Sequence, residues 1–174
     1  MNPQSIRIHT LTVALGLLLR KQRVAALATL DGTGLPQLSL VPFAMDADAC
    51  ALVIHVSALA AHTAALVHQP RGALMVHEDP PDQGPVHALH RVAMQVEPRL
   101  LAPEDPGCDR LRALYLARFP EARPITELGD FRFVQLKLLG GRQVAGFGAA
   151  RSLDADELGQ ALQLATRDDG RNGT

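Results

Sequence analysis

The sequence of 174 residues has very few aromatic side chains, with no tryptophan and a single tyrosine. Aromatic residues make up 3% of the chain, which argues against a protein that binds single-stranded nucleic acid on stacking side chains. The formal net charge is −1, so there is no basic excess to hold a polyanion. We therefore expect no nucleic-acid partner.

Cysteines and long apolar runs are also scarce. Cys50 and Cys108 are too few for a disulfide framework, and neither lies in a CxxC motif. We expect both to be reduced thiols of a cytoplasmic protein. The apolar run Leu11 to Leu19 is too short to cross a bilayer, and basic residues follow it where a signal peptide would be cleaved. We expect no membrane association.

Alternating apolar runs separated by turn residues predict a mainly β protein with added helices. The expected strands are 24–30, 35–43, 51–57, 73–78, 86–101, 131–139 and 142–148. The first three form an antiparallel meander, and Gly140 and Gly141 turn the chain between the last two. The expected helices are about 10–21, a segment between Ser57 and Pro70, about 108–119 and 154–165.

About seven strands plus three or four helices predict an antiparallel barrel with helical additions. No linker or internal repeat divides the chain, so we expect a single domain over 1–174. Its core spans about 10–150, the C-terminal helix follows, and 167–174 is expected to be a frayed tail.

The junction at VSALAAHTAAL, which begins at Val56, is the first candidate site. A strand ends there, Ser57 caps a helix, and the free N–H groups at the helix start favour a phosphate. His62 and Thr63 follow one turn later. The alternative is that Ser57 is only a cap and His62 only a solvated surface residue.

Other polar residues give weaker signals. No Lys or Arg lies between Arg23 and Arg71, so a phosphate bound there has only backbone N–H groups, hydroxyls or histidine to hold it. Arg91, on a mostly apolar strand, either meets an anion or points to solvent. His87 and His90 point to opposite faces of a strand, so we predict no metal site. No GxGxxG or GxSxG spacing occurs, and no catalytic residue is predicted.

The order of the motifs resembles a known family. LLRKQRVAALAT, PQLSLVPF, HVSALAAHTAAL, HRVAMQVEP, YLARFP and GDFRFVQLKLLGGRQVAGFG are similar to successive motifs of the pyridoxamine 5′-phosphate oxidase-like, FMN-binding split-barrel family, on its haem-utilisation branch. The similarity covers roughly 17–150. It implies an antiparallel split barrel and a homodimer with FMN between the subunits.

The resemblance also implies a set of cofactor-binding residues. The strand residues Ser39, Leu40 and Val41 would run along the flavin ring, and the phosphate would lie at the 56–63 junction. The residues expected there are Val56, Ser57, His62 and Thr63. Arg91 would lie near the cofactor, and Gly146 with Phe147 would close the site from the partner subunit.

The sequence departs from the family at several positions. Ala61 and His62 stand where the true oxidases carry an Arg-Lys pair, and Ala64 stands where the related branch has Asn. His62 is then the one residue of the junction that could restore a positive charge. The oxidases' substrate-binding Tyr and Arg residues have no match, so oxidation of pyridoxamine phosphate is not expected. The extra C-terminal domain of the haem-degrading members, with its haem-ligating His, is not found in this sequence.

Three functions follow from these observations. The first is an FMN-binding flavoprotein, an oxidoreductase acting on an unknown small molecule. The second is a haem-binding protein on the same barrel, in which His55, His62, His87 or His90 would ligate iron. The third is a barrel without a cofactor that serves as an interaction module.

Overall fold

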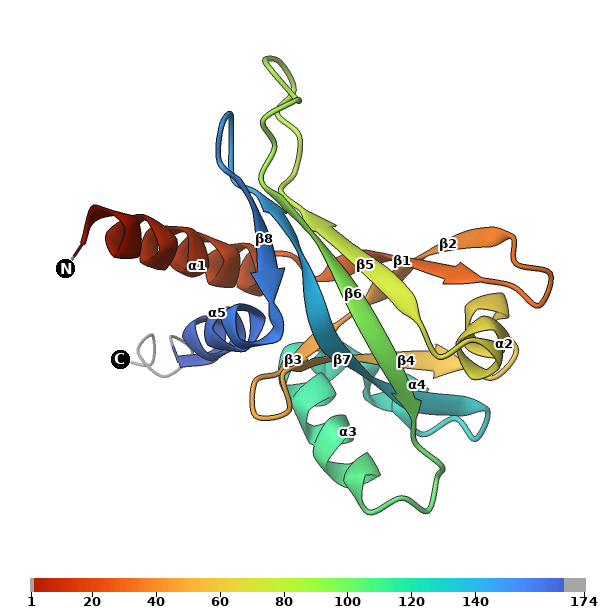
Figure 1. Ribbon diagram of the computed structural model, residues 1–174. Helices are drawn as coiled ribbons and strands as arrows, with labels where there is room; N and C mark the ends of the chain where they lie inside the picture. Colours follow the sequence, from red (N-terminus) through yellow and green to blue (C-terminus); the bar gives the residue numbers. More distant parts are fainter. Residues whose placement is uncertain (1, 168–174) are drawn as a thin grey trace.

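The structure, a computed structural model, describes residues 2–167 and is built on one curled antiparallel sheet (Figure 1). Its strands are β1 (Val24–Leu30), β2 (Pro36–Pro42), β3 (Ala44–Asp46), β4 (Ala51–Ser57), β5 (Gly72–His77), β6 (Arg91–Leu100), β7 (Phe131–Val144) and β8 (Ala150–Asp154). Its helices are α1 (Pro3–Lys21), α2 (Ala61–His68), α3 (Gly107–Arg118), the 3₁₀ turn η1 (Pro120–Ala122), α4 (Arg123–Thr126) and α5 (Ala155–Arg167).

The strands follow the order β2-β1-β5-β6-β7-β4-β3. β7 is long enough to pair with two strands along one edge. Its residues Phe131 to Lys137 pair with β4, and its residues Gly140 to Val144 pair with β8. Its other edge pairs with β6, where the register shifts between Gln95 and Val96. The result is an open, half-barrel sheet, which confirms the predicted antiparallel split barrel.

Two apolar clusters flank this sheet. The main core fills the curl and continues under α1 and α5, which lie side by side in Figure 1, and it includes Leu19, Leu27 and Leu136. A second cluster lies between α3 and the other face of β4 and β7, around Tyr115 and Phe133. The β4–β7 pair is therefore covered on both faces.

Several element boundaries differ from those predicted. α1 begins at Pro3 rather than near Thr10, whose hydroxyl instead donates to the carbonyl of Ile6 within the helix. β4 pairs with β3 and β7 and not with β2, so the expected three-strand meander is wrong. Residues 86–90 lie outside β6, although the expected strand began at 86. Arg167 ends α5, and the rest of the expected tail lies outside the described residues.

Gly140 and Gly141 do not turn the chain; both lie inside β7, and the turn comes later, before β8. A Cβ on Gly141 would lie 2.3 Å from the carbonyl oxygen of Ala93 in β6. Glycine is therefore required because the two strand backbones approach closely beside the register shift.

Candidate functional site

The junction between β4 and α2 is built differently from a capped helix start. The Ser57 hydroxyl donates to a carboxylate oxygen of Asp130 at 2.9 Å and accepts the backbone N–H of Leu59 at 3.1 Å. α2 begins four residues after Ser57, and its N-cap residue, Ala60, makes no side-chain hydrogen bond. The prediction that Ser57 caps the helix is therefore wrong.

Three more of the expected cofactor residues point inward. Val56 is 3% exposed and belongs to the main core, and Val41 of β2 is also buried in it. Thr63 is buried, and its hydroxyl donates to the carbonyl of Ser57 at 2.7 Å. These side chains hold α2 against the sheet, so within one chain they have no free polar group to offer a ligand.

His62 and Ser39 are brought together by the fold. The Nδ1 atom of His62 lies 3.0 Å from the hydroxyl oxygen of Ser39 on β2, and Nε2 makes no hydrogen bond with the residues that the structure describes. Burial lowers the pKa of the half-buried His62 below its ordinary value. The imidazole is therefore neutral at neutral pH, and the expectation that it supplies positive charge to the junction is not met.

Asp130 is the junction residue that the sequence reasoning missed. It immediately precedes β7, its carboxylate accepts from Ser57, and its carbonyl accepts the N–H of Ala58 at 2.7 Å. A carboxylate beside the proposed phosphate position opposes binding of a second anion. Only the pairing of Ser57 with Phe131 places Asp130 there, and that register is not readable from the sequence.

Arg91, Gly146 and Phe147 lie at the opposite end of the sheet. Arg91 pairs with Val144, near the turn that holds Gly146 and Phe147. In Figure 1 this turn and the β5–β6 loop project from the end of the sheet far from α2. Phe147 is 80% exposed, and the Arg91 guanidinium donates to the carbonyl of Leu89 at 3.1 Å. One chain therefore does not gather all the predicted site residues.

The four histidines considered as iron ligands differ in availability. His55 is half-buried beside a cavity of about 180 Å³, smaller than the roughly 300 Å³ at which small-molecule sites begin. Nε2 of His90 lies 3.0 Å from the side-chain amide of Gln143, which occupies it. His87 is exposed in the β5–β6 loop. His62 combines partial burial with a free Nε2 atom.

The structure also bears on metal binding and on insertion into a membrane. Among residues 2–167 no group of three or more His, Cys, Asp or Glu side chains is arranged to hold a metal ion. Within the same part of the chain, every helix is too short or too polar to cross a membrane.

Comparison with known proteins finds one matching family model and two related haem oxygenases. Residues 11–145 match the family model described as pyridoxamine 5′-phosphate oxidase. The chloroplastic haem oxygenase HOZ of Arabidopsis thaliana is 32% identical over 117 residues, which are 67% of this chain and 34% of that protein. The haem oxygenase HutZ of Vibrio cholerae is 26% identical over 146 residues, 83% of this chain and 82% of that protein.

A solved structure with a similar fold also comes from a protein named for haem. A haem-binding protein from Mycobacterium smegmatis superposes with a TM-score of 0.74 at 25% identity, over 86% of this chain and 60% of that protein. The chain thus spans about one third of HOZ and 60% of the mycobacterial protein.

The prediction of an FMN-dependent flavoprotein is wrong. These relatives are named for haem, which favours the alternative stated from the sequence. The junction agrees with this correction, because it offers a phosphate no cation and places the Asp130 carboxylate beside Ser57.

Proposed function

Because the chain belongs to the pyridoxamine 5′-phosphate oxidase family, on the branch of the haem oxygenases HutZ and HOZ, we propose that it binds haem. The observation that carries the proposal is His62, a half-buried neutral imidazole with a free Nε2 atom. Neutral imidazole is the form that ligates haem iron.

The surroundings of His62 suit a porphyrin better than a phosphate. Leu59, three residues before His62, is 88% exposed. A porphyrin is a broad apolar plate, so covering this side chain removes apolar surface from water. Phosphate, in contrast, requires positive charge that this junction does not provide.

Ser39 is the residue that orients His62. If Nδ1–H donates to the Ser39 hydroxyl, the lone pair stands on Nε2, the nitrogen directed away from β2. Such a hydrogen bond fixes the ring and its tautomer, as the second nitrogen of a metal-bound histidine requires. Ser39 and His62 therefore keep a role near the ligand, although not the role in flavin binding expected from the sequence.

We extend the proposal to oxidative opening of the haem, the activity for which HutZ and HOZ are named. Haem as substrate would supply the iron chemistry, and an external donor would supply the electrons. The contribution of this chain would be to cover the haem with apolar side chains and to offer the Nε2 atom of His62, oriented by Ser39, as a ligand to the iron.

Titration with hemin tests the binding proposal. We expect a saturable Soret band for the unchanged protein and a dissociation constant raised about tenfold or more in His62→Ala. His68→Ala is the matched control, because His68 is exposed on the same helix, and it is expected to bind like the unchanged protein. Equal binding by all three proteins, or a loss seen only in His87→Ala, would reject His62 as the ligand.

Oxidation is tested separately on the hemin complex, with ascorbate and air. We expect the Soret band to decay while iron becomes available to a chelator, and the decay to slow in His62→Ala at a hemin concentration that saturates it. A Soret band that persists in the saturated, unchanged protein would limit the function to haem binding.

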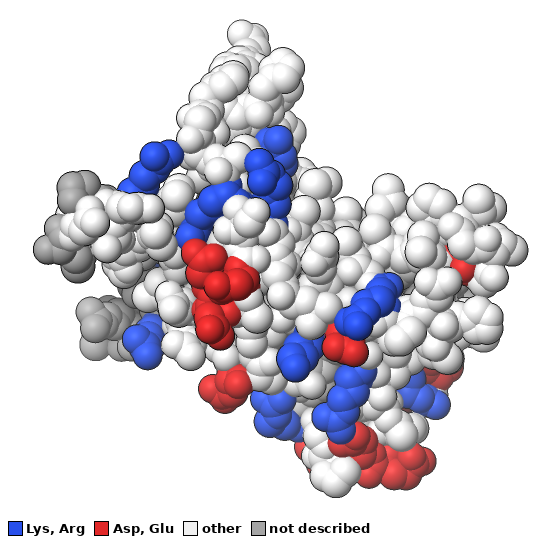
Figure 2. Space-filling model, in the orientation of Figure 1, with Lys and Arg blue, Asp and Glu red and all other residues white. Residues whose placement is uncertain are grey.

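We also propose that two copies of the chain associate through the outer face of the β1–β2 hairpin. Leu40, Ala26, Met75 and Ala93 are directly paired across β2, β1, β5 and β6 and form an apolar row. On the side shown in Figure 2, the surface over this hairpin is white apart from one acidic patch. A flat face of small and apolar side chains is self-complementary, which favours a second copy as its partner.

The cytoplasm is our proposal for the compartment of this protein. Cys50 and Cys108 are both free thiols, as expected of a chain kept in a reducing environment.

A further inference from the structure

A buried side-chain amide joins α1 to the sheet, and His90 is one of its partners. The Gln143 side chain of β7 is fully buried, and its amide nitrogen donates to the carbonyl of Leu11 in α1 at 2.9 Å. Its amide oxygen accepts from the guanidinium of Arg151 in β8 at 2.8 Å. The amide nitrogen also lies 3.0 Å from Nε2 of His90, the residue just before β6. One side chain therefore links α1, β8 and the start of β6.

Arg151 is held in place from two helices. Its guanidinium donates to the carboxylate of Glu157 in α5 at 2.7 Å and to the hydroxyl of Thr12 in α1 at 3.1 Å. Only 14% of the Arg151 side chain is exposed, and Thr12 is buried. The Thr12 hydroxyl donates in turn to the carbonyl of Ile8. The guanidinium that faces the Gln143 amide is therefore fixed by α1 and α5.

These partners determine which way the Gln143 amide faces. Arg151 can only donate, so it requires the amide oxygen, and the Leu11 carbonyl can only accept, so it requires the amide nitrogen. The second hydrogen of that nitrogen is then directed at His90, whose Nε2 must accept it. His90 is therefore neutral in this arrangement, with its ring proton on Nδ1.

A protonated His90 does not fit this arrangement. A second ring N–H would face the N–H of Gln143, donor against donor. Turning the amide over would give the imidazolium an acceptor, but it would set the amide oxygen against the Leu11 carbonyl and the amide nitrogen against Arg151. Buried polar groups without a partner are strongly unfavourable. The charged ring must therefore leave the amide.

Glu78 offers the charged ring another partner. Its carboxylate accepts the backbone N–H of His90 at 2.8 Å, and its own N–H donates to the His90 carbonyl at 2.9 Å. These two bonds close the neck of the β5–β6 loop, which projects from the end of the sheet in Figure 1. An imidazolium that pairs with this carboxylate takes it away from the backbone N–H, so the neck loses one of its two bonds.

The charged groups around His90 come from several elements. Glu78, after β5, is the one whose charge favours the imidazolium. Arg151 of β8 lies on the far side of the amide and is paired with Glu157 of α5. Arg91 of β6 donates to backbone carbonyls of the loop, and α1 contributes an uncharged carbonyl. Glu78 is therefore the carboxylate within reach of a released His90 ring.

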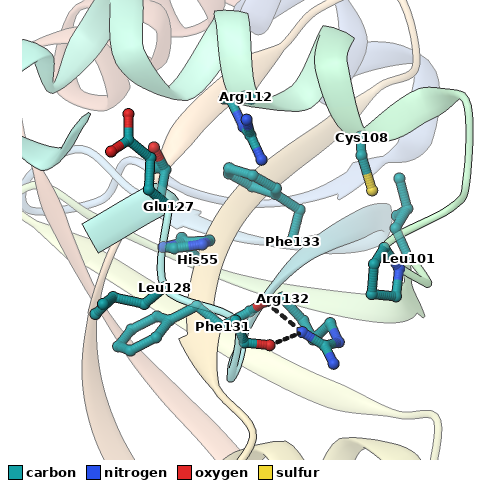
Figure 3. Close-up of a pocket in the computed structure, with 12 residues that line it drawn as sticks. His55, Leu101, Cys108, Arg112, Glu127, Leu128, Phe131, Arg132 and Phe133 are labelled. Carbon is teal, nitrogen blue, oxygen red and sulfur yellow. Dashed lines mark hydrogen bonds between the residues drawn. The ribbon is translucent and has the colours of Figure 1, made fainter. Parts of the chain in front are cut away.

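His55, in contrast, has no comparable bond to lose. Its ring lies among the rings of Phe131 and Phe133 in Figure 3 and makes no side-chain hydrogen bond with the residues that the structure describes. Burial, and then the nearby Arg112 cation, lower its pKa to about 4. His55 therefore stays neutral across the mildly acidic range in which an imidazole ordinarily titrates.

We propose that His90 is a pH-sensitive switch of the β5–β6 loop: neutral, it holds the loop neck to Gln143, and protonated, it releases the amide, pairs with Glu78 and opens the neck. Burial lowers the pKa of His90 below its ordinary value of about 6.5. Its stabilising contribution is thus present above about pH 6.5 and is lost as the pH falls through the lower folded-state pKa.

Nitrogen-15 NMR of the full chain without haem tests the switch. At about pH 7.5 we expect the buried side-chain N–H groups of Gln143 to exchange slowly with solvent. As the pH falls to about 5, their resonances should shift and lose protection together with the titration of the His90 ring. The backbone N–H of His90, corrected for the intrinsic effect of pH, should exchange about tenfold faster or more over the same range.

His90→Gln separates the charge of the ring from its hydrogen bond, because the new amide oxygen can accept from Gln143 at every pH. We expect this variant to keep the neck closed at both pH values. His87→Gln is the matched control, because His87 is exposed in the same loop, and it should open like the unchanged protein.

Three results would overturn the proposal. The first is a His90 ring that stays neutral down to about pH 5. The second is a Gln143 side-chain amide that keeps its protection while His90 titrates, a result that the unchanged protein gives without any variant. The third is an equal dependence of loop exchange on pH in His90→Gln and the unchanged protein.

Discussion

Asp46 shows how a single buried carboxylate can join three elements. It ends β3 with 1% of its side chain exposed, and its oxygens accept from Arg110 of α3 at 2.9 and 2.5 Å and from Gln135 of β7 at 2.7 Å. Burial alone would raise its pKa, but these hydrogen bonds outweigh burial and leave the pKa below its ordinary value. The charged form is therefore the one that stabilises the fold.

Asp46→Asn is expected to lower the free energy of unfolding at neutral pH by about 2 kcal/mol. This is less than the roughly 3–5 kcal/mol of a fully buried pair, because solvent screens the half-exposed Arg110. The folded-state pKa lies below the unfolded one, so the contribution is present above the unfolded pKa and is lost as pH falls through the folded pKa. Denaturant unfolding from about pH 6 to about pH 3 should therefore show a shallower decline for the variant.

Asp82→Asn is the control for this measurement, because Asp82 is exposed in the β5–β6 loop and is not among the charges that act on Asp46 or Arg110. It is expected to follow the unchanged protein at every pH. Parallel pH profiles for Asp46→Asn and the unchanged protein would contradict the assignment.

At the scale of residues, the sequence indicated which residues belong to the junction but not which residues they contact. It singled out His62 and Ser39, which the fold does bring within 3.0 Å of each other. It missed Asp130, because cross-strand register places this residue beside Ser57. It also could not show that His62 is neutral, since burial depends on how α2 packs against β2.

At the scale of elements, α1 and α5 pack closely through one glycine. A Cβ on Gly16 of α1 would lie 2.8 Å from the carbonyl oxygen of Ala161 and 3.3 Å from the nitrogen of Ala165. Those atoms belong to the backbone of α5 and cannot rotate away. Gly16, which weakens an isolated helix, is therefore what permits the two helices to meet.

Gly16→Ala and Gly159→Ala are expected to have opposite effects on stability. Alanine favours a helix by about 1 kcal/mol over glycine, but at position 16 the contact with α5 should reverse the sign and cost roughly 1–3 kcal/mol. A Cβ on Gly159 of α5 would meet only the side chain of Cys50, its sulfur at 3.5 Å and its Cβ at 3.8 Å, which are ordinary contacts, so this variant should gain up to about 1 kcal/mol. Denaturant unfolding measures both, and two changes of the same sign would contradict the packing described.

Pattern reasoning placed the elements well where local signals were strong. The helix expected at 108–119 is α3, and the helix expected at 154–165 is α5 within two residues at its end. The strand expected at 51–57 is β4. The turn predicted at Gly140 and Gly141 was wrong. The sequence does not distinguish a glycine that lets two strands approach closely from a glycine that is needed in a turn.

At the scale of the whole molecule, the apolar face of the hairpin is where we propose that two copies meet. Leu38 and Leu40 of β2 are 77% and 71% exposed, and both point away from the core. Single exposed leucines are common on protein surfaces, but a continuous row of them beside alanines is not. The resemblance from the sequence suggested a homodimer, and this face is where the structure supports that proposal.

Leu40→Lys is expected to weaken dimer formation about a hundredfold or more, because a two-fold interface would bring two buried lysines together. Light scattering after size exclusion should give about twice the 18.7 kDa chain mass for the unchanged protein and approach the chain mass for the variant. Leu17→Lys is the control, since Leu17 is exposed on α1 away from the hairpin. A dimer that tolerates Leu40→Lys would place the interface elsewhere.

The overall architecture was predictable because it depends on many residues acting together. Alternation and turn residues indicated an antiparallel barrel, and the resemblance carried by the order of motifs implied a split barrel. The errors in the meander and in one turn did not change that result. The ligand was not predictable in the same way. It depended on the charge at one junction, where the sequence shows no cation but does not show the carboxylate that lies there.

The two prolines of β2 also bear on how the protein avoids aggregation. Pro36 and Pro42 are the first and last residues of this strand, which pairs with β1 and forms one end of the sheet order. Neither can donate a backbone hydrogen bond, so a foreign strand finds an interrupted row of donors along this edge. The hairpin can thus expose the apolar face that we propose for a second copy, while its proline-bounded edge disfavours open-ended β-sheet growth.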